Sequence, residues 1–259
     1  SVPFAWMFLQ DDPAQKGLQP DGDPEPPRSG PLGSTRRVTG PLETDRWAQP
    51  FRSAPFWQIS MSYMVCGATT LMLALHFVPF AQEDRGISAS MAATIFALMG
   101  GLNIMGGIGA GLLSDRFTRK DLLALAYFIR GLAYMVLLVP PLLGMPVLSG
   151  DLGLWLFAVL AGASWIATGS LTTTLTADVY GLRALGAISG ISIVFHQVGG
   201  FASILLAGFL RDLTGSYTVP FLIAGLLLFP AALSSFSIKE RKYSVRYAAQ
   251  TAPAAAGSD

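Results

Sequence analysis

Two side chains in long apolar stretches of the sequence could bind or move a charged solute: Arg130 and His196. A guanidinium offers a planar fork of donors that can hold a carboxylate at two points, and an imidazole can bind an anion or carry a proton near neutral pH. A charge in apolar surroundings is costly, so it usually faces a partner or a water-filled path. The two residues predict a site for a small anion, although either could instead hold neighbouring helices together.

Three further residues could line the same path. Asn103 and Trp165 lie near the middle of their own apolar stretches, and His76 lies toward one end of another, just before Phe77-Val78-Pro79. Packing roles remain open for all three, and an interfacial helix-end position is the alternative for His76. Whether these five side chains can meet depends on the elements that carry them.

Composition indicates that these elements are membrane spans. Hydrophobic residues make up 52% of the chain and charged residues 13%, with a mean hydropathy of +0.50. A soluble domain of this size would carry a more charged surface. The net charge of +1 argues against a nucleic-acid partner, and the single Cys66 allows neither a disulfide framework nor a cysteine-based metal site. We expect no cofactor.

Six apolar stretches of about 20 to 25 residues are each long enough to cross a bilayer as a helix. They cover 59–80, 89–113, 122–143, 154–176, 187–209 and 219–238. Short connections with turn residues make neighbouring helices antiparallel. The sequence therefore predicts an all-α integral membrane protein with a six-helix bundle over 55–238. Arg130 would lie about 12 Å into its helix, near the middle of the membrane.

The remaining segments flank this bundle. Residues 1–9 are apolar but too short to span, and we interpret them as the end of an earlier span. Residues 10–54 are rich in Pro, Gly and Arg without apolar periodicity, which predicts a flexible linker. Residues 239–259 form a tail.

Most of the charge in the central part of the chain falls in one turn, Gly111-Leu-Leu-Ser-Asp-Arg-Phe-Thr-Arg-Lys120. This order resembles the loop signature of the major facilitator superfamily of secondary transporters, with Thr118 where the signature usually has Gly. The resemblance implies a gating or latch loop, in which Asp115 docks against a helix end of the other half of the transporter. A solvated turn is the alternative. The residues that carry the signature are Gly111, Asp115, Arg116, Arg119 and Lys120.

A second stretch, 176–217, resembles spans ten and eleven of the monocarboxylate-transporter-like and oxalate/formate-antiporter-like branch. The resemblance implies that the six stretches are spans seven to twelve, the C-terminal half of a twelve-helix fold. In that fold spans seven, eight, ten and eleven line the path, which favours His196, Asn103 and Trp165. The stretch 89–113 lacks the acidic residue and the arginine typical of span eight in monocarboxylate transporters. This difference argues against proton-coupled transport of the lactate type.

Glycine spacing also bears on helix contacts. Gly107-xxx-Gly111 and Gly186-xxx-Gly190 form ridges of the kind that allow close helix packing in lipid. These ridges predict either static packing or an interface that slides during alternating access.

Basic residues predict the orientation. With the linker in the cytoplasm, 14 Lys and Arg residues fall on the cytoplasmic side, and only Arg85 and Arg211 lie outside. The positive-inside rule then predicts a multi-pass protein of the cytoplasmic membrane with both ends of the chain in the cytoplasm.

Other classes of protein lack their required residues in this sequence. The spans contain no pair of central acids for an aspartyl protease, no matched histidines for a haem, and no Gly-rich phosphate loop for an ATP-driven pump. We therefore expect no enzyme but one half of a secondary transporter that moves a small organic anion by alternating access. Its expected partners are the bilayer, the missing N-terminal half and a small-molecule substrate, with or without a coupled proton. The alternatives are a transporter or efflux pump for neutral or amphipathic compounds, and a non-transporting six-helix assembly subunit.

Overall fold

The computed structural model describes residues 40–145 and 150–247, which belong to one compact unit. The predicted end of an earlier span, most of the predicted linker and the last residues of the tail lie outside the described residues. The elements are η3 (Gln49–Arg52), α2 (Ala54–Glu83), α3 (Ala89–Ser114), α4 (Arg119–Leu142), α6 (Asp151–Tyr180), α7 (Leu185–Thr214), α8 (Thr218–Phe236) and α9 (Glu240–Tyr243).

Six of these helices, α2 to α4 and α6 to α8, are long and apolar enough to cross a membrane. The shortest, α8, has 19 residues and therefore spans about 28 Å. Within the described ranges the chain contains no strand, so the predicted all-α class with six spanning helices is confirmed.

Most helices continue past the apolar stretches that predicted them. α2 begins five residues before the predicted start, and α7 ends five residues after the predicted end. Both α6 and α7 end at a glycine with positive φ, 77° at Gly181 and 74° at Gly215. Because glycine adopts this left-handed region without a steric penalty, it ends a helix where hydropathy alone gives no sharp boundary.

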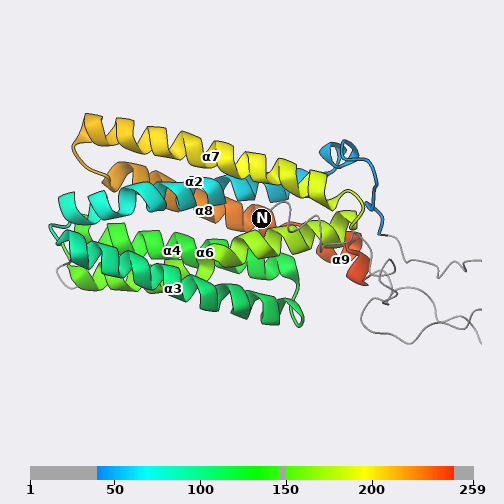
Figure 1. Cartoon of the computed structure of the whole chain (residues 1–259), viewed down its shortest axis with the longest axis horizontal. Coiled ribbons are helices and arrows are strands. Elements are labelled where there is room, and N and C mark those ends of the chain that lie inside the picture. The colour runs from blue at the N-terminus through cyan, green and yellow to red at the C-terminus, as the bar shows by residue number, and fades with distance from the viewer. Residues whose placement is uncertain (1–39, 146–149, 248–259) are drawn as a thin grey trace, which may run out of the picture. The chain divides into compact units, whose positions relative to one another are not determined.

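The first three and the last three spanning helices make equivalent packing contacts (Figure 1). α2 packs along α7 and α3 along α6, while α4 contacts both α6 and α8, and α2 also contacts α8. If α2, α3 and α4 are exchanged with α6, α7 and α8 in that order, the same set of helix pairs is obtained. Such a pattern is typical of the inverted repeats found in secondary transporters.

Glycines allow close backbone contact in two helix pairs, α2 with α7 and α3 with α6. A Cβ on Gly67 of α2 would lie 1.8 Å from the carbonyl oxygen of His196 on α7, and a Cβ on Gly106 of α3 would lie 2.0 Å from that of Ala163 on α6. Real Cβ atoms do not approach an oxygen so closely, so only glycine fits at these positions. These contacts bring the backbones of α2 and α7, and of α3 and α6, together beside the centre of the bundle.

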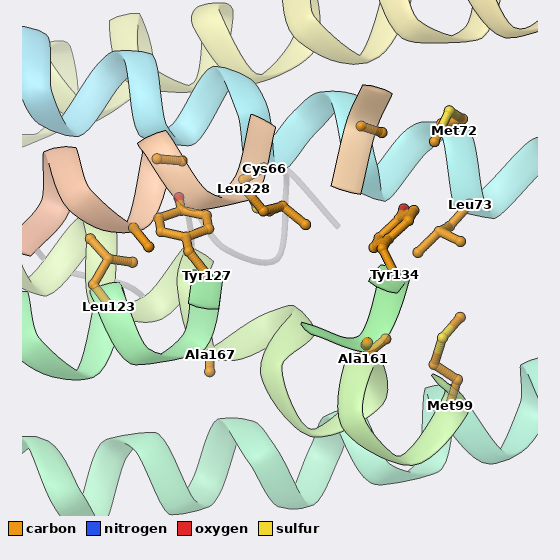
Figure 2. Packing of buried hydrophobic residues seen from close by; sticks show 14 of the residues in the cluster. Cys66, Met72, Leu73, Met99, Leu123, Tyr127, Tyr134, Ala161, Ala167 and Leu228 are labelled. Carbon is orange, nitrogen blue, oxygen red and sulfur yellow. The ribbon is translucent and has the colours of Figure 1, made fainter. Parts of the chain in front are cut away.

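The core between α4, α2 and α8 contains two fully buried tyrosines (Figure 2). The rings of Tyr127 and Tyr134 point from α4 toward α2 and α8, near Cys66 and Leu228. The Tyr134 hydroxyl donates to the carbonyl oxygen of Thr69 at 3.3 Å. This hydrogen bond joins α4 to α2 inside the apolar core.

Two helices present most of their apolar surface outward. Only 17% of the residues in the most apolar window of α3 and of α7 are buried, against 44 to 56% in the other four. Met105 on α3 is 69% exposed and Phe201 on α7 is 66% exposed. These surfaces are available to lipid or to a further part of a larger protein.

Candidate functional site

Arg130 lies in the middle of α4 and is only 1% exposed. Its Nη2 donates to the carbonyl oxygens of Ser164 at 2.6 Å and Trp165 at 2.9 Å, and to Oγ1 of Thr168 at 3.2 Å, all on α6. The guanidinium therefore fastens α4 to α6 at mid-span.

The other terminal nitrogen of Arg130 points to α2. Nη1 lies 3.4 Å from Sγ of Cys66 and 3.5 Å from Oγ1 of Thr69. One side chain thus connects three helices through carbonyl, hydroxyl and thiol groups. It is buried rather than open to a path.

No carboxylate balances the charge of Arg130 in the part of the chain that the structure describes. Its partners are neutral groups or a thiol, and each Asp or Glu of residues 54–238 lies near a helix end or in a loop. A charge buried in a membrane protein without a counter-ion is costly, and such charges mark functional sites. The site is therefore electropositive.

His196 lies beside this centre on α7, half-buried. Its ring is tilted against the ring of Tyr63 on α2, with 4.6 Å between centroids, and Nδ1 is 3.0 Å from Oε1 of Gln197. His196 also lies close enough to Cys66 to interact with the thiol. Cys66 therefore connects the buried guanidinium to the half-buried imidazole.

Tyr63 reaches from α2 toward α6. A Cβ on Gly169 would lie 3.6 Å from the Tyr63 hydroxyl, so the missing side chain leaves space at this point. Tyr63 is half-buried, and its hydroxyl makes no hydrogen bond to any described residue. With His196 it forms a partly open polar surface over the buried Cys66 and Arg130.

Asn103 and Trp165 do not join this polar surface directly. Asn103 is buried on α3, and its Oδ1 accepts a hydrogen bond from the backbone N–H of Ile166 on α6. The Trp165 ring is half-buried and lies edge-on to Phe96, with 6.0 Å between centroids. The backbone of α6 is therefore held from both sides in this region, by Asn103 from α3 and by Arg130 from α4.

His76 lies far along α2 from this centre. Its Nε2 is 3.3 Å from the carbonyl oxygen of Ile204 on α7, and its ring is 5.3 Å from that of Tyr217. The structure therefore brings together Arg130 and His196 through Cys66, and leaves His76 near the opposite end of the bundle from the 111–120 loop.

The predicted 111–120 loop comprises the end of α3, a short turn and the start of α4, and its side chains fall into two groups. Gly111, Asp115 and Arg116 are exposed, and neither of the two charged side chains makes a hydrogen bond or ion pair among the described residues. Arg119 forms an ion pair with Asp178 at the end of α6 and donates to the carbonyl oxygen of Thr174 at 3.0 Å.

Lys120 belongs to the fixed part of the loop. Its Nζ donates to the carbonyl oxygen of Phe236 at 2.8 Å and lies 4.3 Å from the centre of that ring. The first part of the loop is thus free to meet another surface, while the second part is bound to the bundle.

Two residues from the segment that follows α8, Glu240 and Arg246, also bind this region. The fully buried carboxylate of Glu240 accepts the backbone N–H groups of Arg119 at 3.1 Å and Lys120 at 2.7 Å, which satisfies free donors at the start of α4. Arg246 donates to the carbonyl oxygen of Ser114 at 2.7 Å and also to that of Asp115, at the end of α3. The tail therefore holds the ends of the two helices that flank the loop.

Sequence reasoning missed several of these residues. From the sequence, Cys66 bears only on disulfides and metal sites, and Tyr63, Asp178, Glu240 and Arg246 carry no predicted role. For Tyr63 and Cys66 the sequence does contain a signal, because residues three positions apart in a helix share a face. An acid near the end of an apolar stretch is a weaker signal, because its partner depends on tertiary packing.

The sequence matches the model of the Major Facilitator Superfamily over residues 1–204. It is 30% identical over 194 residues to monocarboxylate transporter 12-B of Danio rerio, which covers 74% of this chain and 39% of that protein. It is 29% identical over 197 residues to a probable sulfoacetate transporter of Cupriavidus necator, which covers 74% of this chain and 44% of that protein.

A third relative, the MFS transporter asaE of Aspergillus flavus, is 26% identical over 181 residues, or 70% of this chain and 39% of that protein. The chain thus spans less than half the length of these three relatives. The matched family consists of transporters, not enzymes, and the six spanning helices agree with a multi-pass membrane protein. The chain belongs to the major facilitator superfamily.

Proposed function

We propose that this chain is the C-terminal half of a secondary transporter that moves a small organic anion, preferably a carboxylate, by alternating access. The observation that carries the proposal is the guanidinium of Arg130, which is buried at mid-span without a carboxylate partner among the described residues. A positive charge in low-dielectric surroundings attracts an anion and repels a cation.

Two relatives support an anionic substrate. One is named a monocarboxylate transporter and another a probable sulfoacetate transporter, and both names denote anions. The polar surface of Tyr63 and His196 offers a phenol and an imidazole, which can both donate hydrogen bonds to a carboxylate.

Arg130 and His196 have different tasks in this site. Both terminal nitrogens of Arg130 are already held by α2 and α6, so the guanidinium acts from behind the polar surface as a fixed positive charge. His196 is half-buried and contacts the substrate directly. Asn103 and Trp165 keep α3, α4 and α6 in register around this surface.

The second half of the path would come from six further helices. The outward apolar surfaces of α3 and α7 fit such a partner, as does the carboxylate of Asp115, which has no partner among the described residues. The chain matches only 39 to 44% of the length of these two relatives, which leaves room for such a half. The positive-inside rule favours the cytoplasmic membrane with the 111–120 loop and the tail in the cytoplasm.

Uptake of a carboxylate against its uncharged amide analogue tests this function in the full-length transporter. We expect strong preference for the carboxylate, and loss of that preference when Arg130 is replaced by Met. Equal uptake of both compounds, unaffected by replacement of Arg130 or His196, would contradict the proposal and favour a neutral or amphipathic substrate. Absence of saturable uptake of any solute would favour the non-transporting alternative.

A further inference from the structure

A groove lies between α4 and α8, at the end of the bundle that carries the 111–120 loop. Its volume is about 460 Å³, and it is lined by apolar side chains and one carboxylate: Ala124, Leu125, Phe128, Phe229, Ala232, Leu233, Phe236 and Asp121. On α4 the lining extends from Asp121 to Phe128 and on α8 from Phe236 back to Phe229, which corresponds to about 10 Å along each helix. The groove therefore runs through much of one leaflet of a bilayer, which is about 15 Å thick.

An aromatic pair closes the inner end of this groove. The rings of Phe128 and Phe229 meet edge to face, with 5.7 Å between centroids. Phe229 lies against Gly131, where a Cβ would lie 3.1 Å from its ring. Ala124 and Ala232 are buried and form the inner surface with their small side chains. The groove is thus blind at mid-membrane and open toward the helix ends.

A hydrocarbon chain is the ligand that fits this lining. Leu233 and Phe236 are 69% and 57% exposed, and both helices of the groove cross the membrane, so lipid chains surround them. An exposed apolar groove of this kind marks a site for an apolar partner. The outward surfaces that fit a second half belong to α3 and α7, so a partner there does not have to cover the groove.

Basic side chains gather at the open end of the groove. Nζ of Lys120 lies 4.3 Å from the centre of the Phe236 ring, which lines the groove. Lys239, Arg241 and Lys242 follow Phe236 closely in the chain, and all three are exposed. None of these three forms an ion pair with a described residue, so their charges are available to an anion.

Glu240 fixes this basic segment beside the groove. Its buried carboxylate accepts the backbone N–H groups of Arg119 and Lys120, so α9 is held at the start of α4. The carboxylate of Asp121 is also engaged, since it lies 3.2 Å from Nζ of Lys120 and accepts the hydroxyl of Thr118. The four basic side chains outnumber these two acids, and the open end of the groove is electropositive.

We propose that this groove binds an acyl chain of an anionic phospholipid, whose headgroup phosphate is held by Lys239, Arg241 and Lys242. Ammonium and guanidinium groups donate charge-assisted hydrogen bonds to phosphate oxygens. Basic clusters beside a membrane span attract anionic lipids, which are concentrated in the cytoplasmic leaflet. The orientation proposed above places the open end of the groove in that leaflet. The bound lipid joins α4, α8 and α9, and it does so whichever solute is transported.

Native mass spectrometry of the full-length transporter in detergent tests the headgroup contact. The protein is titrated with phosphatidylglycerol, which is anionic, or with phosphatidylcholine of the same acyl chains, which has no net charge. The parent should bind one phosphatidylglycerol at least tenfold more tightly than phosphatidylcholine. Joint replacement of Lys239, Arg241 and Lys242 by Gln should abolish this preference and leave binding of phosphatidylcholine unchanged.

A matched variant controls for the general charge of this end of the bundle. Joint replacement of Arg46, Arg52 and Arg183 by Gln removes three exposed charges from the same end, at the start of α2 and after α6. This variant should keep the full preference for phosphatidylglycerol. Equal loss of the preference in both triple variants would show an unspecific surface charge and would overturn the proposal.

A second pair of variants tests the groove itself. Leu233→Trp places a larger side chain on its wall and should weaken the binding of both lipids at least fivefold. Leu226→Trp is the control, because Leu226 is also exposed on α8 but lies two turns away, outside the lining residues. Equal lipid binding by these two variants would contradict a chain in the groove.

Thermal unfolding of the unsubstituted full-length protein gives a readout that needs no variant. A lipid that binds only the folded protein stabilises it by mass action, so phosphatidylglycerol should raise the unfolding temperature more than phosphatidylcholine does. Equal effects of the two lipids would overturn the proposal, as would a lipid-free dimer in the mass spectra, which would assign the groove to a second copy of the protein. Lipid binding is measured without any solute, so failure here leaves the proposed transport function intact.

Discussion

The guanidinium of Arg130 donates to the carbonyl oxygen of Ser164 at 2.6 Å, which ties the middle of α4 to the middle of α6. The same side chain supplies the charge of the proposed site. A structural and a functional task therefore meet in one residue, and two substitutions separate them.

We expect Arg130→Lys and Arg130→Met to affect stability and uptake in opposite order. Lysine keeps the charge, but its single nitrogen cannot reach α2 and α6 in the same geometry, so an incompletely satisfied charge stays buried at a cost of about 1–3 kcal/mol or more. Methionine removes the charge together with its desolvation cost and should be less destabilising. Anion uptake should fall further in Arg130→Met than in Arg130→Lys.

Thermal unfolding in detergent and carboxylate uptake in vesicles would be measured on the same preparations. Equal uptake by Arg130→Met and the parent would show that the guanidinium only connects helices. Greater stability of Arg130→Lys than of Arg130→Met would show that the charge, and not the fork of hydrogen bonds, holds α4 in place.

Gly67→Ala should separate α2 from α7. The new Cβ would lie 1.8 Å from the carbonyl oxygen of His196, so the helices must move apart, at an expected cost of about 1–3 kcal/mol. Gly186→Ala on α7 is the control, because a Cβ there meets no atom within 4 Å. A lower unfolding temperature for the first variant alone is the expected result, and equal temperatures would contradict the close contact.

These glycines show where prediction from sequence succeeds and where it fails. Hydropathy and length predicted the six helices because a span must be apolar over about 20 residues whatever it packs against. Of the predicted ridge positions, a Cβ on Gly107 would lie 3.2 Å from the side chain of Ile166, whereas a Cβ on Gly111, Gly186 or Gly190 would meet nothing within 4 Å. The closest backbone contacts fall at Gly67, Gly106 and Gly199. Spacing identifies small residues, but the rotation of each helix decides which of them face a neighbour.

The polar residues show a similar division. A lone arginine in an apolar stretch predicts a buried charge, and Arg130 is buried. Its partners could not be predicted, because two of the strongest hydrogen bonds go to backbone carbonyls, which every residue carries. The pairing of Arg119 with Asp178 and of Glu240 with the start of α4 likewise joins residues about 60 and 120 positions apart.

Glu240 should make stability depend on pH. Burial raises its pKa above the ordinary carboxyl value, and the N–H groups of Lys120 and Arg119 only partly oppose this shift. A raised pKa in the folded state means that the group favours folding below its unfolded pKa of about 4.3, and that this contribution is lost as the pH rises through the raised value.

Glu240→Gln removes this titration. The stability of the parent relative to Glu240→Gln should therefore be higher at the acidic end of this window than at pH 7.5, as measured by thermal unfolding in detergent. Lys239→Gln, at an exposed neighbour, should show no such pH-dependent difference. A constant difference between parent and Glu240→Gln across the window would exclude a raised pKa.

Asp115 and Asp178 provide the sharpest test of the 111–120 loop, because the two carboxylates lie near the same end of the bundle in different surroundings. Asp178 pairs with Arg119, whereas the carboxylate of Asp115 is exposed and has no partner among the described residues. Asp178→Asn should lower the unfolding temperature because it leaves Arg119 without its counter-charge.

Asp115→Asn should instead leave stability nearly unchanged and alter the balance between inward-open and outward-open states. If Asp115 docks against a helix end of the other half, that contact exists in only one of the two states, and its loss shifts the population toward the other. Single cysteines placed on either side of the path of the full-length transporter, and labelled from each side of the membrane, would report the shift. Opposite changes in labelling on the two sides are expected for Asp115→Asn. Labelling identical to that of the parent on both sides would reduce Asp115 to a solvated turn residue.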